Sequence, residues 1–156
     1  MVKSVTLVDA TIVESARRKP THAERAEGTQ GDPEAAYATK GGRAYYGFKA
    51  HVADDEEHTL IRTAELTAAN VHDSRKFKDV CPADTEMAIA DKAYYSAEHE
   101  AWLAATRAGI EKIFGHWKRG LGWRRMRYTG LLKGTLELQL KSVAWNLKRL
   151  VTLCAA

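Results

Sequence analysis

Two aspartates of this sequence stand where a carboxylate is out of place. Asp9 lies inside the apolar run 5–13, and Asp91 directly follows the apolar run 87–90. Both runs have the apolar composition of buried strands, where an unpaired carboxylate is costly. A divalent cation would compensate for both, because Mg²⁺ prefers carboxylate oxygens together with water and phosphate. Two such ions about 3.5–4 Å apart can activate a water and stabilise the leaving oxygen in phosphodiester cleavage.

The alternative explanation for these two acids is structural. Each one would then sit at a strand edge and pair with Lys49, with Lys92 or with a backbone N–H, without any metal. From these residues alone, both interpretations stay open.

The strands that would carry the acids belong to an α/β pattern. Runs 45–53 and 60–68 have strand character and form a hairpin, and the acidic turn 54–57 between them is expected to be solvated. Residues 14–42 are polar and contain six Gly or Pro residues, which predicts a long mobile loop. The whole order predicts a mixed sheet with flanking helices, in which acids from separate strands meet at one edge.

The second half of the chain is predicted to be mainly helical. Helices are expected over four ranges: 74–80, 97–108, 110–119 and 132–153. Asp73 is a candidate N-cap of the first. The third carries an apolar stripe from Ile110 to Trp117 at positions i, i+3, i+4 and i+7, and the leucines of the last keep a helical period.

Composition limits the class of protein. The chain has 156 residues, of which 45% are hydrophobic and 28% charged, as in one folded globular domain. No apolar run approaches the ~20 residues that span a bilayer, and the N-terminus lacks a signal-peptide pattern. The two cysteines have no Cys-x-x-Cys spacing, which excludes a disulfide scaffold. We therefore expect a soluble, cytoplasmic protein without a membrane partner.

Positive charge is concentrated in the last third of the chain. Residues 107–156 contain 11 Lys or Arg and 2 Asp or Glu, whereas the preceding residues contain 13 and 18. Clustered cations attract phosphate, although a solvated helix face would also explain them. Trp117, Trp123 and Tyr128 lie among these cations and are candidates for stacking on unpaired bases. A core position explains Trp117 at least as well.

Six segments, in order, resemble a bacterial insertion-sequence transposase of the DDE type. They are VDATIVESA, KGGRAYYGFKAHVADDE, LIRTAELTAANVHDS, AIADKAYYS, IEKIFGHWKRGLGWRRMRYTGL and NLKRL. The resemblance implies a ribonuclease H-like fold, Mg²⁺- or Mn²⁺-dependent strand cleavage and strand transfer, and a role in DNA transposition in the bacterial cytoplasm. The expected partner is double-stranded DNA, as transposon ends and as target, and a homodimer is the assembly to test.

The resemblance also assigns site residues by position. Asp9 and Asp91 match the first two catalytic, metal-binding acids, and Glu111 matches the third. A signature of the wider family has an Arg four residues before this Glu and a Lys seven after it, and the Tyr expected seven before it is Ala104 here. The expected DNA-binding residues are the cations of the last third: Arg107, Lys118, Arg119, Arg124, Arg125 and Arg127.

Two departures from the family predict a truncated copy. Asp9 comes only eight residues after Met1, and Glu111 follows Asp91 by 20 positions, which is shorter than the family's usual segment. A continuous helix over 97–119 would place Glu111 about 22 Å along its axis from Ser96, at ~1.5 Å per residue, so the triad is expected to be incomplete.

The prediction is therefore one DDE catalytic domain over 1–156, with a mobile loop at 14–42, a basic part at 107–156 and a C-terminal helix. It is expected to be N-terminally truncated and internally shortened, and whether such a copy is active stays open. A non-catalytic DNA-binding remnant is the alternative, and a nuclease without strand transfer stays open because the same two-metal chemistry serves both reactions.

Overall fold

A mixed sheet forms the centre of the fold. The computed structural model describes residues 5–28, 31–83, 85, 87–90 and 110–155. In this part of the chain five strands form one sheet: β1 Val5–Glu14, β2 Ala36–Lys40, β3 Arg43–Asp55, β4 Ile61–Ala68 and β5 Met87–Ala90. The long strand β3 is antiparallel to β1, β2 and β4, and β5 is parallel to β1. The predicted α/β class with a ribonuclease H-like mixed sheet is confirmed.

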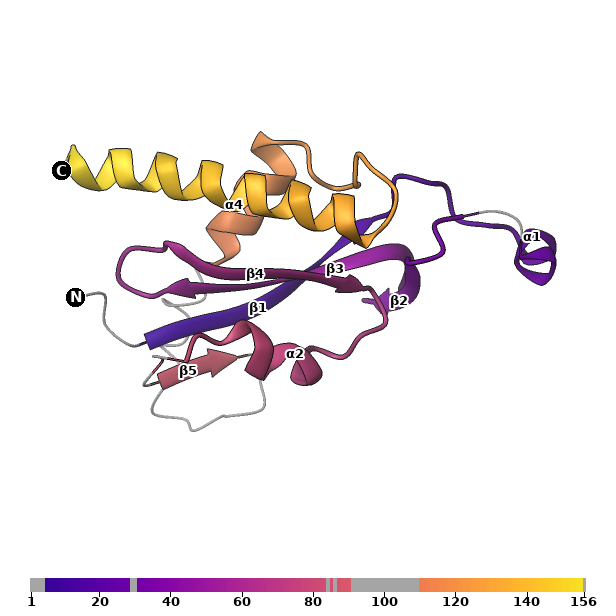
Figure 1. The fold of residues 1–156 in the computed structure, drawn as a ribbon, viewed down its shortest axis with the longest axis horizontal. Helices are drawn as coiled ribbons and strands as arrows, with labels where there is room; N and C mark the ends of the chain where they lie inside the picture. Colours follow the sequence, from indigo (N-terminus) through magenta and orange to yellow (C-terminus); the bar gives the residue numbers. More distant parts are fainter. Residues whose placement is uncertain (1–4, 29–30, 84, 86, 91–109, 156) are drawn as a thin grey trace.

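Different helices cover the two faces of this sheet (Figure 1). Residues that pair across antiparallel strands share a face, so the pairing of Asp9 with Val52 puts Asp9 on the face that carries the main core. That face packs against α4 (Leu131–Cys154) through Leu138 and against the helical residues 110–120. The other face is covered by α2 (Asp73–Val80), whose Lys76 forms an ion pair with Glu65 at 2.7 Å.

The strand predictions are confirmed, but the long loop is not. Strands expected over 5–13, 45–53, 60–68 and 87–90 are observed as β1, β3, β4 and β5. The predicted loop 14–42 instead contains α1 (His22–Glu27) and β2. α1 begins at a capping box, in which the Thr21 and Glu24 side chains each accept from the other residue's backbone N–H. β2 pairs with β3 across a two-residue turn, which the sequence pattern did not separate from irregular structure.

The helix predictions hold in part. The helix expected over 74–80 is α2, and His72 rather than Asp73 is its N-cap. The helix expected over 97–108 lies outside the described residues. The one expected over 110–119 is helical at 110–115 and continues as a π-helical turn, His116–Gly120. The C-terminal helix is confirmed as α4.

α4 buries one face and exposes a second apolar face. Leu138 is fully buried against the sheet, as expected for an amphipathic helix. The opposite side exposes a stripe of large apolar residues, here called the α4 stripe: Leu132, Leu136, Leu140, Val143, Leu147, Leu150 and Val151. Even so, no helix in the described ranges is long and apolar enough to cross a membrane.

Two of the four acids at 54–57, Asp54 and Asp55, are not solvated as predicted. Asp54 and Asp55 still belong to β3 and are 0% and 1% exposed. The Asp55 carboxylate accepts hydrogen bonds from the N–H groups of His58 and Leu60, at 2.6 and 2.8 Å, and so builds the following turn. Neither carboxylate oxygen of Asp54 has a hydrogen-bond partner within the described structure. Burial, reinforced by the charges of Asp55 and Asp9, raises the pKa of Asp54 to about 8.

Candidate active site

Asp9 lies in the middle of β1 and is half-buried on the core side of the sheet. Its Oδ1 accepts a hydrogen bond from the N–H of Ala10 at 2.7 Å. Asp9 pairs with Val52 of β3, and β5 pairs with the residues of β1 that precede Asp9, from Val5 to Val8. The parallel pairing of Val8 with Ala90 brings the end of β5 level with Asp9.

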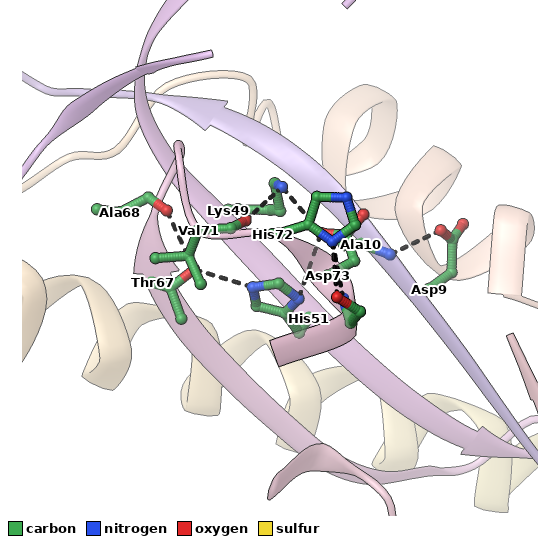
Figure 2. Close-up of polar contacts among 10 residues, drawn as sticks. Asp9, Ala10, Lys49, His51, Thr67, Ala68, Val71, His72 and Asp73 are labelled. Carbon is green, nitrogen blue, oxygen red and sulfur yellow. Dashed lines mark hydrogen bonds and ion pairs between the residues drawn. The ribbon is translucent and has the colours of Figure 1, made fainter. Parts of the chain in front are cut away.

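The structural alternative allowed three kinds of partner for Asp9: a backbone N–H, which Ala10 supplies, Lys92, which lies outside the described residues, and Lys49, which does not pair with it. The Lys49 ammonium donates to the carbonyl of Val71 at 2.7 Å and forms an ion pair with Asp73 at 2.8 Å, on the opposite face of the sheet. Figure 2 shows Lys49 and His51 converging on Asp73, with Asp9 apart from them on β1. This second cluster holds the start of α2 against the sheet.

A pocket of about 160 Å³ joins Asp9 to Glu111. Ala90, the last residue of β5, and buried Ile110 also line it. The helix-length argument placed Glu111 about 22 Å from Ser96, at ~1.5 Å per residue. Ser96 lies outside the described residues, so that distance stays a prediction, but Glu111 does line one pocket with Asp9 and Ala90. Ile110 explains the placement, since its burial in the core anchors the start of the helical segment beside β1 and leaves neighbouring Glu111 exposed at the pocket.

Asp91 and Arg107 lie outside the described residues. Asp91 is the next residue after Ala90, which lines the pocket. Their predicted roles therefore stay predictions.

Lys118 approaches the same region from the π-helical turn. Its ammonium donates to the hydroxyl of Thr11 at 2.6 Å, two residues along β1 from Asp9. Burial lowers the pKa of Lys118, and the charges of Lys40 and Arg124 lower it further, while Asp9 acts in the opposite direction. Two carboxylates and Lys40 line the pocket, and Lys118 lies beside it at Thr11, a combination of charges that suits a metal and a phosphate.

Two protein-family models match this chain. One, described as a transposase DDE domain, matches residues 1–106, and a second with the same description matches residues 80–151. The first match covers more than half of the sequence. The chain belongs to the DDE transposase domain family. No solved structure matches it.

DDE domains use a divalent metal, and the donor set of this DDE domain fits one. Asp9 and Glu111 supply carboxylate oxygens to one pocket, which are the ligands that Mg²⁺ or Mn²⁺ prefers. Within the described ranges, which leave out Asp91, no three acidic, His or Cys side chains are grouped closely enough to hold a metal. Any third acidic ligand of such a site would lie outside these ranges.

The other cations expected to bind DNA differ in their surroundings. Arg119 and Arg124 are exposed. Arg125 forms an ion pair with Glu14 at 3.2 Å, and the Arg127 guanidinium lies 3.8 Å from Glu137. Backbone hydrogen bonds from Glu14 N–H to Arg124 carbonyl, 3.0 Å, and from Met126 N–H to Glu14 carbonyl, 2.7 Å, fix this basic loop to the end of β1.

Two of the three aromatic candidates for base stacking are wrong. Trp117 and Trp123 are 0% and 1% exposed and pack edge to face, with 5.4 Å between ring centroids. They form core beneath the basic loop, because large rings gain more from burial than from solvent exposure. Tyr128 remains 54% exposed.

Sequence reasoning missed Lys40, which lines the pocket together with Asp9 and Glu111. The signal that was available is the Gly41–Gly42 pair between strand-like residues, a pattern typical of a two-residue hairpin turn.

Proposed function

We propose that this DDE domain binds double-stranded DNA and catalyses metal-dependent phosphodiester cleavage and strand transfer, as an insertion-sequence transposase of the bacterial cytoplasm. The observation that carries the proposal is the single pocket lined by Asp9, Glu111 and the residue that precedes Asp91. Membership of the DDE family supports it.

In this proposal Asp9, Asp91 and Glu111 hold Mg²⁺ or Mn²⁺. The bound metal supplies an activated water and stabilises the leaving oxygen. Lys118, fixed by Thr11, contacts the DNA backbone beside the acids. Arg107, Arg119, Arg124, Arg125 and Arg127 extend the DNA-binding surface away from the pocket.

Metal titration by calorimetry tests the proposed triad. We expect wild-type protein to bind Mg²⁺ or Mn²⁺, and Asp9→Ala, Asp91→Ala and Glu111→Ala each to abolish binding, because each removes a charged ligand. Glu57→Gln is the matched control: it neutralises a carboxylate that is 63% exposed on the turn after β3, and it should leave metal binding unchanged.

Two other outcomes would contradict this assignment. Metal binding that depends on Asp9 and Asp91 but ignores Glu111 would favour the DNA-binding remnant. Salt-dependent DNA binding that is indifferent to Asp9→Ala and to Mg²⁺, with no cleavage of duplex DNA, would favour a protein that binds without cutting.

We also propose that the domain forms a homodimer through the α4 stripe. From Leu136 to Leu150 the exposed apolar residues follow one another at spacings of 4, 3, 4 and 3. This alternation is the heptad pattern by which two helices pack along a common seam. Burying the stripe in this way removes from water an apolar surface that a monomer would expose.

A further inference from the structure

The pocket of the acids has a cation on its wall, Lys40, whose role the family assignment leaves open. Lys40 is the last residue of β2, and its side chain is exposed. No carboxylate of the described structure forms an ion pair with it, although Asp9 and Glu111 line the same pocket. A lysine whose role was to neutralise those acids would contact one of them.

The hairpin holds Lys40 in place at the pocket. Lys40 pairs with Arg43 across Gly41 and Gly42, whose φ angles of 57° and 74° suit a tight hairpin turn that most other residues cannot adopt. Further along the hairpin, the rings of Tyr37 and Tyr46 pack with 4.9 Å between centroids. The Tyr46 hydroxyl also donates to the carbonyl of Asp32 at 2.7 Å, which ties the hairpin to the chain before it.

Like charges gather beside this pocket. Burial and the charges of Lys40 and Arg124 lower the pKa of Lys118, whose ammonium donates a hydrogen bond to Thr11. Lys118 is half-buried, whereas Lys40 and Arg124 are exposed, and their like charges repel its ammonium. An anion placed among the three cations would relieve this repulsion. An anion among these cations would also lie near two carboxylates, which repel it unless a metal lies between them. A DNA phosphodiester beside a metal-binding site would both neutralise the cations and be shielded from the acids.

We propose that Lys40 binds a backbone phosphate of the DNA at the mouth of this pocket, adjacent to the phosphate that is cleaved. The assignment rests on the proposed function, because a pocket that does not act on DNA needs no such contact. Lys40 is a positioning residue: its ammonium holds the strand in register with the acids and takes no part in bond cleavage.

The test is the salt dependence of DNA binding, measured by fluorescence anisotropy with a labelled duplex oligonucleotide. Loss of one phosphate contact lowers the magnitude of the slope of the log association constant against log salt concentration by about 0.9. Between about 1 M and 0.1 M salt this amounts to about eightfold weaker binding. We expect this change for Lys40→Gln and no change for Lys40→Arg, which keeps the charge.

Arg43→Gln is the matched control, because Arg43 is the cross-strand neighbour of Lys40, is equally exposed and carries the same charge. Its guanidinium lies over the ring of Tyr45, 5.3 Å from the centroid. We expect a smaller loss for this variant than for Lys40→Gln. Thermal unfolding should leave Lys40→Gln unchanged, since a contact made only with DNA does not stabilise the free protein.

The outcomes separate this assignment from the proposed function. If wild-type protein binds the duplex and Lys40→Gln keeps the full slope, the Lys40 contact is refuted and the function stands. Equal losses for Lys40→Gln and Arg43→Gln would also refute it, because the hairpin tip would then act only through its net charge. If wild-type protein does not bind the duplex at all, the proposed function fails first.

Discussion

At the scale of single residues, two aspartates on the core face of the sheet differ in burial and in hydrogen bonding. Asp9 lines a pocket and is half-buried, whereas Asp54, on the same face, is completely buried and lacks a hydrogen-bond partner in the described structure. A buried carboxyl group without partners keeps its proton, because its charged form is the costly one. The two aspartates therefore affect stability in different ways.

Asp54→Asn should stabilise the protein at neutral and alkaline pH. The pKa of Asp54 is about 8 in the folded protein and near 3.8 in the unfolded chain, so the unfolded state alone releases this proton between those values. The contribution of Asp54 to the free energy of unfolding is therefore fully present below pH 3.8 and falls by about 1.4 kcal/mol per pH unit until pH 8. Urea unfolding of the variant at several pH values should show this fall removed.

Asp55→Asn is the control for that experiment. The neighbouring carboxylate is equally buried but accepts hydrogen bonds from two backbone N–H groups. Replacing it should destabilise the protein by about 1–3 kcal/mol, since a charged acceptor is lost from the turn. Stabilisation by both substitutions would contradict the distinction drawn between the two acids.

At the scale of elements, the close contact between β1 and β3 depends on a glycine, Gly47, which has no side chain. A Cβ added to Gly47 would lie against the backbone carbonyl oxygen of Val13 and 2.6 Å from the backbone nitrogen of Ser15. Backbone atoms in a paired strand cannot move aside as a flexible side chain does. Gly47→Ala should therefore lower the free energy of unfolding by about 1–3 kcal/mol or more, measured by urea denaturation.

Gly134→Ala provides the comparison, because the Cβ would there meet only the side-chain ends of Met126 and Leu66. Replacing Gly by Ala inside a helix also gains about 1 kcal/mol of helix propensity. A smaller loss than for Gly47→Ala is expected. A larger one would mean that the contact of α4 with β4 is less adaptable than the β1–β3 contact.

The sequence predicts elements best where one signal dominates. Apolar runs gave β1, β4 and β5, and the leucine period gave α4, because burial and periodicity act over many residues. β2 was missed because two glycines in a polar stretch indicate a loop as readily as a hairpin, and pairing with β3 decides between them. The stripe on α4 shows the same limit: its period identifies a helix and leaves open which face packs.

The residues of the candidate site, like the elements, were predictable from the sequence only in part. Asp9 was noticed because a carboxylate inside an apolar strand needs a compensating partner, and the resemblance to the family then chose the metal over the structural explanation. Glu111 followed from resemblance alone, and its position at the pocket depends on Ile110 entering the core, which chain length does not reveal. Lys40 required tertiary structure, since it lies far from Asp9 and Glu111 in sequence.

At the scale of the whole molecule, the proposed homodimer through the α4 stripe predicts what charges placed in the stripe will do. Leu136→Lys with Leu147→Lys should reduce the assembly from twice the mass of one chain to the monomer, as measured by light scattering after gel filtration, because charges at a helical seam cannot be buried. Thr152→Lys is the control, since it adds charge at an exposed α4 position outside the stripe. A wild-type protein that is monomeric at high concentration would refute the dimer.

The hydrogen bonds that join the basic loop to the end of β1 give the molecule a mechanical property. Glu14, which makes both of these backbone bonds, is five residues from Asp9 along one continuous strand. β3 pairs with every residue of β1 from Asp9 to Glu14, so this length of strand resists bending and stretching. If DNA binds the basic loop as proposed, a force on Arg124 or Arg125 would be transmitted along β1 to the carboxylate at the pocket.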